Sequence, residues 1–213
     1  MVWQGVHAPI LLLPGTLPPE LCEALVRHYD RDLPVHASDG FTSPGYGREP
    51  GEFKVRHEAG YGRMTELVLL DPALVARLDG ILRQQVIPRI AEAFRGRIGK
   101  REPWRIAGYE APDGFVGPHT DAATEATRGR NFTVTVNLNA GEYGGGDLRF
   151  PTFADGAYAV ERGTGIVWAA TLRHEVLPVT RGRRFILGVH LRRPDRPAGA
   201  PPRDSGPARA GQT

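Results

Sequence analysis

The 213-residue chain is 40% hydrophobic and 24% charged, which is typical of a globular domain with a sizeable core. Its formal net charge of +3 arises at the C-terminal end, where residues 181–213 hold eight Arg and two Asp, so it does not indicate a nucleic-acid surface. The chain has one cysteine, which excludes an intrachain disulfide. It shows neither a long apolar run nor a signal-peptide pattern. We therefore expect a cytoplasmic protein that binds neither nucleic acid nor membrane.

The first part of the chain predicts a short strand followed by a helix. The stretch APILLLPG at 8–15 is strand-like, and TLPPELCEALVRHYDRDLP at 16–34 has apolar residues at helical spacing. Residues 36–63 are dense in Gly and polar side chains, which indicates a mobile loop or an irregular hairpin.

A second helical pattern starts after Asp71, which is suited to cap it. The pattern runs through PALVARLDGILRQQVIPRIAEAF at 72–94, with one apolar face and an expected kink at Pro88. We therefore expect the strand and helices of residues 8–96 to pack on whatever core the rest of the chain forms.

From Trp104 onward the pattern changes to short strands separated by turns. Strands are predicted near 104–110, 117–121, 131–139, 146–150, 157–161, 164–170, 173–179 and 184–192. This number of strands in a short segment predicts a mainly β fold with covering helices, whose core is a double-stranded β-helix of the jelly-roll or cupin-like type. Residues 1–193 should then form one domain with its core at 104–192, and the Pro- and Arg-rich residues 194–213 a disordered tail.

Two His-x-Asp sequences occur in the chain, and their predicted structures distinguish them. His28 and Asp30 end the first helix, where positions i and i+2 lie about 200° apart and their side chains diverge. His119 and Asp121 fall on the strand predicted at 117–121, where positions i and i+2 face the same side about 6.6 Å apart. Only the second pair is placed to converge on a metal ion, and the first is expected to be solvated polar residues at a helix end.

A metal centre needs a further ligand from elsewhere in the fold. Two His and one carboxylate on one face of the ion are the usual set for a non-haem Fe(II) oxygenase, with the remaining positions open. His174 opens a predicted strand 55 residues after His119 and is the best candidate, and His190 on the last strand is its rival.

The strand NFTVTVNLN at 131–139 alternates strictly between apolar and polar side chains. Its polar face meets water if the strand is half exposed, but in a small barrel the polar face lines an interior ligand cavity while the apolar face packs on helices. The pattern alone leaves both interpretations open.

These residues resemble a known family. The motifs GYEAPDGFVGPHTD, GGGDLRF and HEVLPVTRGRR within residues 104–192 are similar to the Fe(II)/2-oxoglutarate-dependent oxygenases, in particular their prolyl 4-hydroxylase-like branch. The resemblance implies that His119, Asp121 and His174 form the catalytic metal triad. The upstream helical pattern also looks like the helix that covers such barrels, so the resemblance spans roughly residues 64–192, and more weakly the N-terminal strand and helix.

Further roles follow from the same resemblance. Arg184, ten residues after His174, is implied to pair with the distal carboxylate of 2-oxoglutarate, and Arg183 is its neighbouring rival. Tyr109, Thr133 and Asn137 are implied to contact the same cosubstrate, although relatives often have Tyr where this chain has Asn137.

The implied activity is a hydroxylation. The resemblance implies Fe(II), 2-oxoglutarate and O2, with ascorbate as a supporting reductant, and the oxidative decarboxylation of 2-oxoglutarate to succinate coupled to hydroxylation of an unactivated C–H bond. We expect a small-molecule substrate, such as an amino acid or a natural-product intermediate, with segments 36–63 and 122–131 flanking the barrel mouth. The alternatives are a peptidyl or prolyl hydroxylase and a cupin-type metal enzyme or sensor that does not use 2-oxoglutarate. The sequence does not indicate an oligomeric state.

Overall fold

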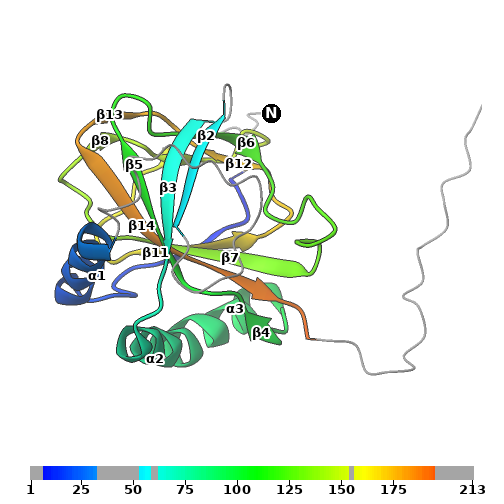
Figure 1. The fold of residues 1–213 in the computed structure, drawn as a ribbon. Helices are drawn as coiled ribbons and strands as arrows, with labels where there is room; N and C mark the ends of the chain where they lie inside the picture. Colours follow the sequence, from blue (N-terminus) through cyan, green and yellow to red (C-terminus); the bar gives the residue numbers. More distant parts are fainter. Residues whose placement is uncertain (1–6, 33–52, 59–61, 154–155, 195–213) are drawn as a thin grey trace, which may run out of the picture.

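The computed structural model describes residues 7–32, 53–58, 62–153 and 156–194. The described part consists mostly of antiparallel strands in a large and a small sheet, which face each other across the interior (Figure 1). The prediction of a mainly β fold with covering helices and a jelly-roll core is therefore confirmed. In the described ranges, no helix has the length and apolar character needed to cross a membrane.

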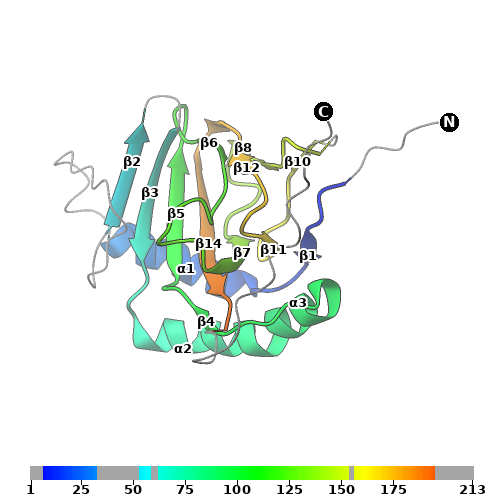
Figure 2. The ribbon, with the colours of Figure 1, turned by 90° about the vertical axis from the view of Figure 1, so that its right-hand side faces the viewer.

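The large sheet has the order β1-β11-β7-β14-β5-β3-β2, and β4 pairs with the end of β14. Figure 2 shows its long strands side by side. The bounds are β1 Leu11–Leu13, β2 Phe53–Glu58, β3 Gly62–Val68, β4 Lys100–Arg101, β5 Arg105–Glu110, β7 Arg130–Asn137, β11 Gly165–Ala169 and β14 Arg183–Arg192.

The small sheet has the order β10-β9-β12-β6, and a short ribbon of β8 and β13 lies beside it. The bounds are β6 Val116–His119, β8 Gly144–Gly145, β9 Leu148–Arg149, β10 Ala157–Tyr158, β12 His174–Val176 and β13 Val179–Arg181. Every strand expected in the core region is present at least in part, but 146–150 is shortened to β9 and 173–179 is divided into β12 and β13, while β8 was not expected.

The two faces of β7 show why the sheet needs helices on one side only. Phe132 and Val134 belong to the apolar core under the helices, whereas Thr133 and Thr135 line a cavity between the sheets. The alternation along this strand therefore marks an interior polar face, as in a barrel with a ligand cavity, and not a solvated edge.

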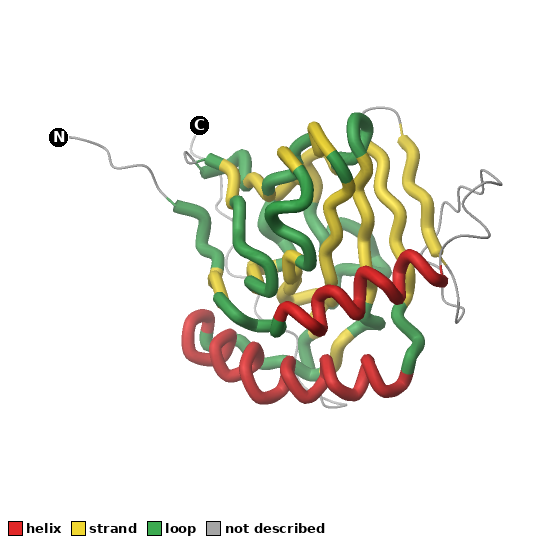
Figure 3. Tube along the Cα trace, turned by 90° about the vertical axis from the view of Figure 1, so that its left-hand side faces the viewer, coloured by secondary structure: helices red, strands yellow, loops and turns green. Residues whose placement is uncertain are grey.

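The described helices lie on one side of the large sheet and cross its strands (Figure 3). They are α1 Pro19–Asp32, α2 Pro72–Ile81 and α3 Ile87–Phe94, with a π-helical segment at Leu82–Val86 joining the last two. Their apolar side chains meet those of the sheet in one buried cluster that includes Leu21, Leu25, Leu78, Ile90, Val134 and Leu187.

The cap predicted for the second helical pattern is confirmed, and the helix changes type just before Pro88, where a kink was predicted. The Asp71 carboxylate accepts hydrogen bonds of 2.9 Å from the N–H groups of Ala73 and Leu74, which caps α2. Pro88 lies at the start of α3, directly after the π-helical segment. Because proline has no N–H to donate, a local change of hydrogen-bond register there accommodates it without ending the helix.

The loop predicted at 36–63 is described only in its last part, since residues 33–52 and 59–61 lie outside the described residues. There β2 pairs with β3 from Phe53–Leu67 to Glu58–Gly62, and β3 continues to Val68 as a strand of the large sheet beside β5. The hairpin alternative is thus the one observed, and it extends the core sheet. The tail predicted to be disordered, 194–213, lies beyond the described residues except for Pro194.

Candidate metal centre and its cavity

Three side chains converge between the two sheets. His119 is the last residue of β6 and pairs directly with His174, the first residue of β12. The strand predicted at 117–121 was too long, because β6 ends at His119 and Asp121 lies in the turn that follows. That turn is held by the Asp121 N–H, which donates 2.9 Å to the carbonyl of Ala170.

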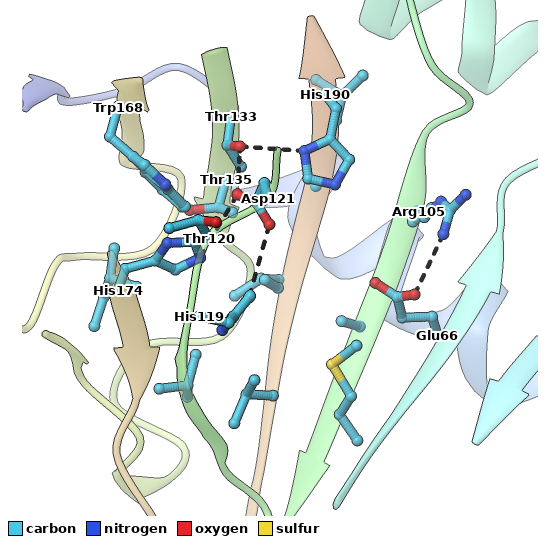
Figure 4. Close-up of a pocket in the computed structure, with 18 of the residues that line it drawn as sticks. Glu66, Arg105, His119, Thr120, Asp121, Thr133, Thr135, Trp168, His174 and His190 are labelled. Atoms are coloured by element: carbon cyan, nitrogen blue, oxygen red, sulfur yellow. Dashed lines mark hydrogen bonds and ion pairs between the residues drawn. The ribbon is translucent and has the colours of Figure 1, made fainter. Parts of the chain in front are cut away.

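The distances suit one small ion. Asp121 Oδ1 lies 3.7 Å from His119 Nε2, and Asp121 Oδ2 lies 3.6 Å from His174 Nε2. One ligand atom from each residue lies within 4.8 Å of the others, and Figure 4 shows the three side chains pointing toward one another. Two His and one carboxylate form the facial set that suits Fe(II) and leaves further positions open.

Backbone carbonyls orient both imidazoles. His119 Nδ1 lies 2.9 Å from the carbonyl oxygen of Gly117, and His174 Nδ1 lies 3.0 Å from that of Leu172. Because a carbonyl can only accept, each Nδ1 carries the proton and each Nε2 presents a lone pair toward Asp121. This is the tautomer that a metal ligand needs, so the residues present fit Fe(II).

The carboxylate of Asp121 is held as an anion. Burial alone raises the pKa of Asp121, but the hydrogen bond from the Thr133 hydroxyl and any positive charge on His174 and His190 outweigh it and hold the pKa below its ordinary value. Thr133 Oγ1 donates a 2.5 Å hydrogen bond to Asp121 Oδ2. Thr133 therefore contacts the metal carboxylate, a role that differs from the cosubstrate contact that the resemblance implied.

His190, the rival for the third ligand position, is not in this group. It lies on β14, with its Nδ1 3.1 Å from Thr133 Oγ1. Since Thr133 gives its proton to Asp121, it accepts from His190 Nδ1–H. Burial holds the pKa of His190 below its ordinary value, so the ring is neutral near pH 7.

A cavity of about 350 Å³ opens beside the triad, and Arg184 closes one end of it. Arg184 is 7% exposed, yet its Nε and Nη1 atoms have no hydrogen-bond partner among the described residues. Its Cζ lies 5.1 Å from the ring centre of Tyr109, a cation–π contact, and burial raises the pKa of Tyr109 to about 12, so the phenol stays neutral. A buried guanidinium that lines a cavity and has unsatisfied donors fits a carboxylate, which is what 2-oxoglutarate would bring.

Arg183 points the opposite way. Its guanidinium pairs with Asp30 of α1 at 2.7 Å, outside the barrel. Neighbouring positions on a strand face opposite sides, so only Arg184 enters the cavity.

Asn137 does not line the cavity, although the resemblance implied a contact with the cosubstrate. Its amide nitrogen donates to the Tyr143 hydroxyl at 2.6 Å and to the Val160 carbonyl at 3.2 Å, and its oxygen accepts from the Asn139 N–H at 3.1 Å. These contacts use its hydrogen-bonding groups to hold the end of β7 against a neighbouring loop.

Gly146 looks in the sequence like one of several turn glycines, but in the structure it lies against the side chain of Arg184. Its φ of +73° is in the left-handed region, and a Cβ there would lie 2.7 Å from Arg184 Cδ. The glycine therefore leaves the space through which the Arg184 side chain runs, a role that only the three-dimensional contact reveals.

The other end of the cavity holds residues that the sequence interpretation missed, Arg105 and Glu66 above all. The signal for Arg105 was available, because it shares strand parity with Tyr109 on β5. From the segment 122–131, which was expected to flank the mouth, Ala123 and Thr124 line the cavity.

The comparisons with known proteins agree with this geometry. Residues 104–192 match the model of the 2OG-Fe(II) oxygenase superfamily. No protein of curated function matches the chain in sequence. Among solved structures, the viral collagen prolyl hydroxylase of Paramecium bursaria Chlorella virus 1, in a complex with 2-oxoglutarate, has a TM-score of 0.63 at 17% identity, covering 88% of this chain and 97% of that one.

Two further structures share the fold. A prolyl 4-hydroxylase of Pseudomonas putida has a TM-score of 0.60 at 21% identity, covering 89% of this chain and 95% of that one. A prolyl hydroxylase of Trichoplax adhaerens, in a complex with a peptide fragment of hypoxia-inducible factor, has a TM-score of 0.61 at 14% identity, covering 87% of this chain and 84% of that one.

Proposed function

We propose that this chain is a 2OG-Fe(II) oxygenase, the superfamily whose model matches residues 104–192, and that His119, Asp121 and His174 hold its Fe(II). The observation that carries the proposal is the pair of backbone carbonyls that direct both histidine Nε2 atoms toward Asp121. With 2-oxoglutarate and O2, the iron supplies the oxidant that hydroxylates a C–H bond while 2-oxoglutarate is decarboxylated to succinate.

The protein's own part is to orient and to exclude water. Thr133 fixes the Asp121 carboxylate, and Trp168 packs against His174 with ring centres 4.8 Å apart, which limits the movement of that imidazole. Arg184 receives the distal carboxylate of 2-oxoglutarate, for which its unsatisfied donors and buried position are suited. The retained carboxylate of Asp121 favours hydroxylation, because the related halogenases lack it at this position.

For the substrate, we propose a small molecule of amino-acid type. A cavity of about 350 Å³ that also receives the cosubstrate is at the small end of ligand pockets, and it contains charged side chains beyond those that the metal and 2-oxoglutarate use. The second candidate is a peptidyl prolyl residue, which is favoured by the prolyl hydroxylases that share the fold.

The test is anaerobic reconstitution of the full chain with Fe(II), followed by addition of 2-oxoglutarate and air. We expect iron-dependent release of succinate, slow without a substrate and faster when free amino acids or prolyl peptides are added. His174→Ala should abolish the iron-dependent part, because it removes one of the ligands.

A matched control is Asp30→Ala, which removes the carboxylate of the other His-x-Asp pair at the surface of α1. It should release succinate like the unmodified protein. Full succinate release by His174→Ala would contradict the triad, and no iron-dependent succinate from folded protein would contradict the oxygenase assignment.

A further inference from the structure

A second pair of opposite charges lies inside the cavity. Arg105 on β5 and Glu66 on β3 both line it, with side chains only 13% and 20% exposed. Figure 4 shows this pair across the cavity from the metal centre. Burying a charge is costly unless it is compensated, so a pair kept at this place needs an explanation beyond surface solubility.

The contact between the two groups is long. Arg105 Nη1 donates to Glu66 Oε2 at 3.4 Å. By comparison, Asp79 receives hydrogen bonds of 2.5 and 2.8 Å from Arg101 outside the cavity. The direct contact between Arg105 and Glu66 is therefore the weaker of the two, which favours its exchange for contacts with a bound molecule.

Open space adjoins the pair. Gly188 on β14 is the strand partner of Arg105 and also lines the cavity. A Cβ added at Gly188 would meet nothing closer than the Arg105 carbonyl oxygen at 4.0 Å. A substrate can therefore approach the pair over Gly188 without displacing a side chain.

The remaining charges of the cavity are already used. Asp121 serves the metal centre, Arg184 is suited to the cosubstrate, and Arg130 forms hydrogen bonds of 3.0 and 2.5 Å with Glu102. Among the described charged residues of the cavity, Arg105 and Glu66 remain as one positive and one negative group that belong neither to the metal centre nor to the proposed cosubstrate contact. A ligand with a single charge that separated this pair would leave its other member buried without that partner, whereas a ligand with both charges matches both members.

His190 adds an acceptor to the same wall. Its Nδ1–H is directed to Thr133, so in the neutral ring Nε2 carries a lone pair on the opposite side. Such a nitrogen accepts a hydrogen bond from an ammonium N–H but cannot donate one to a carboxylate. It therefore favours an ammonium group on this wall of the cavity, as Glu66 does.

We propose that Arg105 and Glu66 form a subsite for a free amino acid, whose α-carboxylate binds Arg105 and whose α-ammonium binds Glu66 and His190. The side chain of that amino acid then extends toward the metal centre. The inference rests on the proposed function for its chemistry, but the subsite itself binds the zwitterion whether or not turnover follows.

The test is a binding measurement that does not require turnover. The full chain, with 2-oxoglutarate and redox-inert Zn(II) and without O2, is titrated calorimetrically with each standard L-amino acid and with its N-acetyl carboxamide, which has the same side chain without either charge. We expect at least one free amino acid to bind more than about tenfold more tightly than its capped form, because each lost charged hydrogen bond weakens binding substantially.

Three variants sharpen the result. Arg105→Gln and Glu66→Gln should each remove most of the preference for the free form, and Gly188→Ala should weaken binding by filling the open space while leaving both charges. The matched control is Arg101→Gln, which breaks the corresponding pair outside the cavity and should keep the preference.

Equal or tighter binding of the capped forms, or of a prolyl peptide, would overturn the proposal, as would the absence of binding by every free amino acid. Retention of the preference in both Arg105→Gln and Glu66→Gln would do the same. Failure of the proposed function is separate, because it appears as the absence of iron-dependent succinate from the Fe(II) protein.

Discussion

The two His-x-Asp sequences of this chain have the same spacing and opposite surroundings. In α1, His28 Nε2 contacts Asp32 at 3.2 Å and its Nδ1 faces Arg31 at 2.7 Å, while Asp30 turns away to Arg183. At the end of β6, His119 and Asp121 meet His174 from the opposite strand. The spacing alone does not make a site: the second pair becomes one because a neighbouring strand brings a further ligand and backbone carbonyls orient both rings.

The largest effect should come from removing the carboxylates of the two pairs in turn. Asp121→Ala should lower iron-dependent succinate release about a hundredfold or more, because it removes an anionic ligand from a buried site. Asp30→Ala should retain the full rate. Comparable rates for the two variants, measured at saturating Fe(II), would remove the distinction between the pairs.

The next effect concerns the two arginines at the start of β14. Arg184 lines the cavity, whereas Arg183 faces α1. Arg184→Gln should raise the KM for 2-oxoglutarate about tenfold or more, because a buried guanidinium–carboxylate contact is lost. Arg183→Gln breaks only the exposed contact with Asp30 and should leave that KM unchanged. An increase in KM for Arg183→Gln alone would reverse the assignment.

A smaller effect is expected from the residue that holds the metal carboxylate. Thr133→Val keeps the shape but removes the hydrogen bond to Asp121, and should weaken metal affinity about tenfold, as the loss of such supporting contacts typically does. Titration with Fe(II) or Mn(II) measures it. Unchanged affinity would show that the hydrogen bond does not orient Asp121.

The smallest effect belongs to the end of α1. The hydrogen bond from Arg31, with His28 nearby, holds the pKa of Asp32 below its ordinary value of 3.8. A lowered pKa in the fold contributes stability above about pH 3.8 that is lost as the pH falls below it. Asp32→Asn should make the free energy of unfolding, measured with denaturant, slightly less dependent on pH in this acidic range. Because the group is exposed, this difference should be smaller at high salt. A large change near neutral pH would contradict this.

Much of the fold could be predicted from local periodicity in the sequence. The alternation of β7 predicted which residues share a face, because strand parity is a local property, but it left open whether the polar face meets water or a cavity. The Asp71 cap and the disturbance before Pro88 were visible for the same reason. The triad could be named because strand parity and the family resemblance agreed.

Properties that depend on pairing between distant strands could not be predicted. His28 is only 7% exposed, so the expectation of a solvated residue at the helix end was wrong for it. Asn137 has the parity of Thr133, but the cavity ends before it, and only the three-dimensional packing sets that limit. Arg105 and Glu66 meet because β3 joins β5, a pairing that the Gly-rich preceding segment concealed.

The direct pairing of His119 with His174 has a consequence for how the protein is maintained. An ion bound there would tie β6, its following turn and β12 together, and these segments are separated in the chain but adjacent in the small sheet. Because the unfolded chain cannot assemble that site, a metal concentration a hundred times the dissociation constant would raise the unfolding free energy by about 2.7 kcal/mol. Loss of the ion would then lower the stability of the folded protein as well as stop turnover.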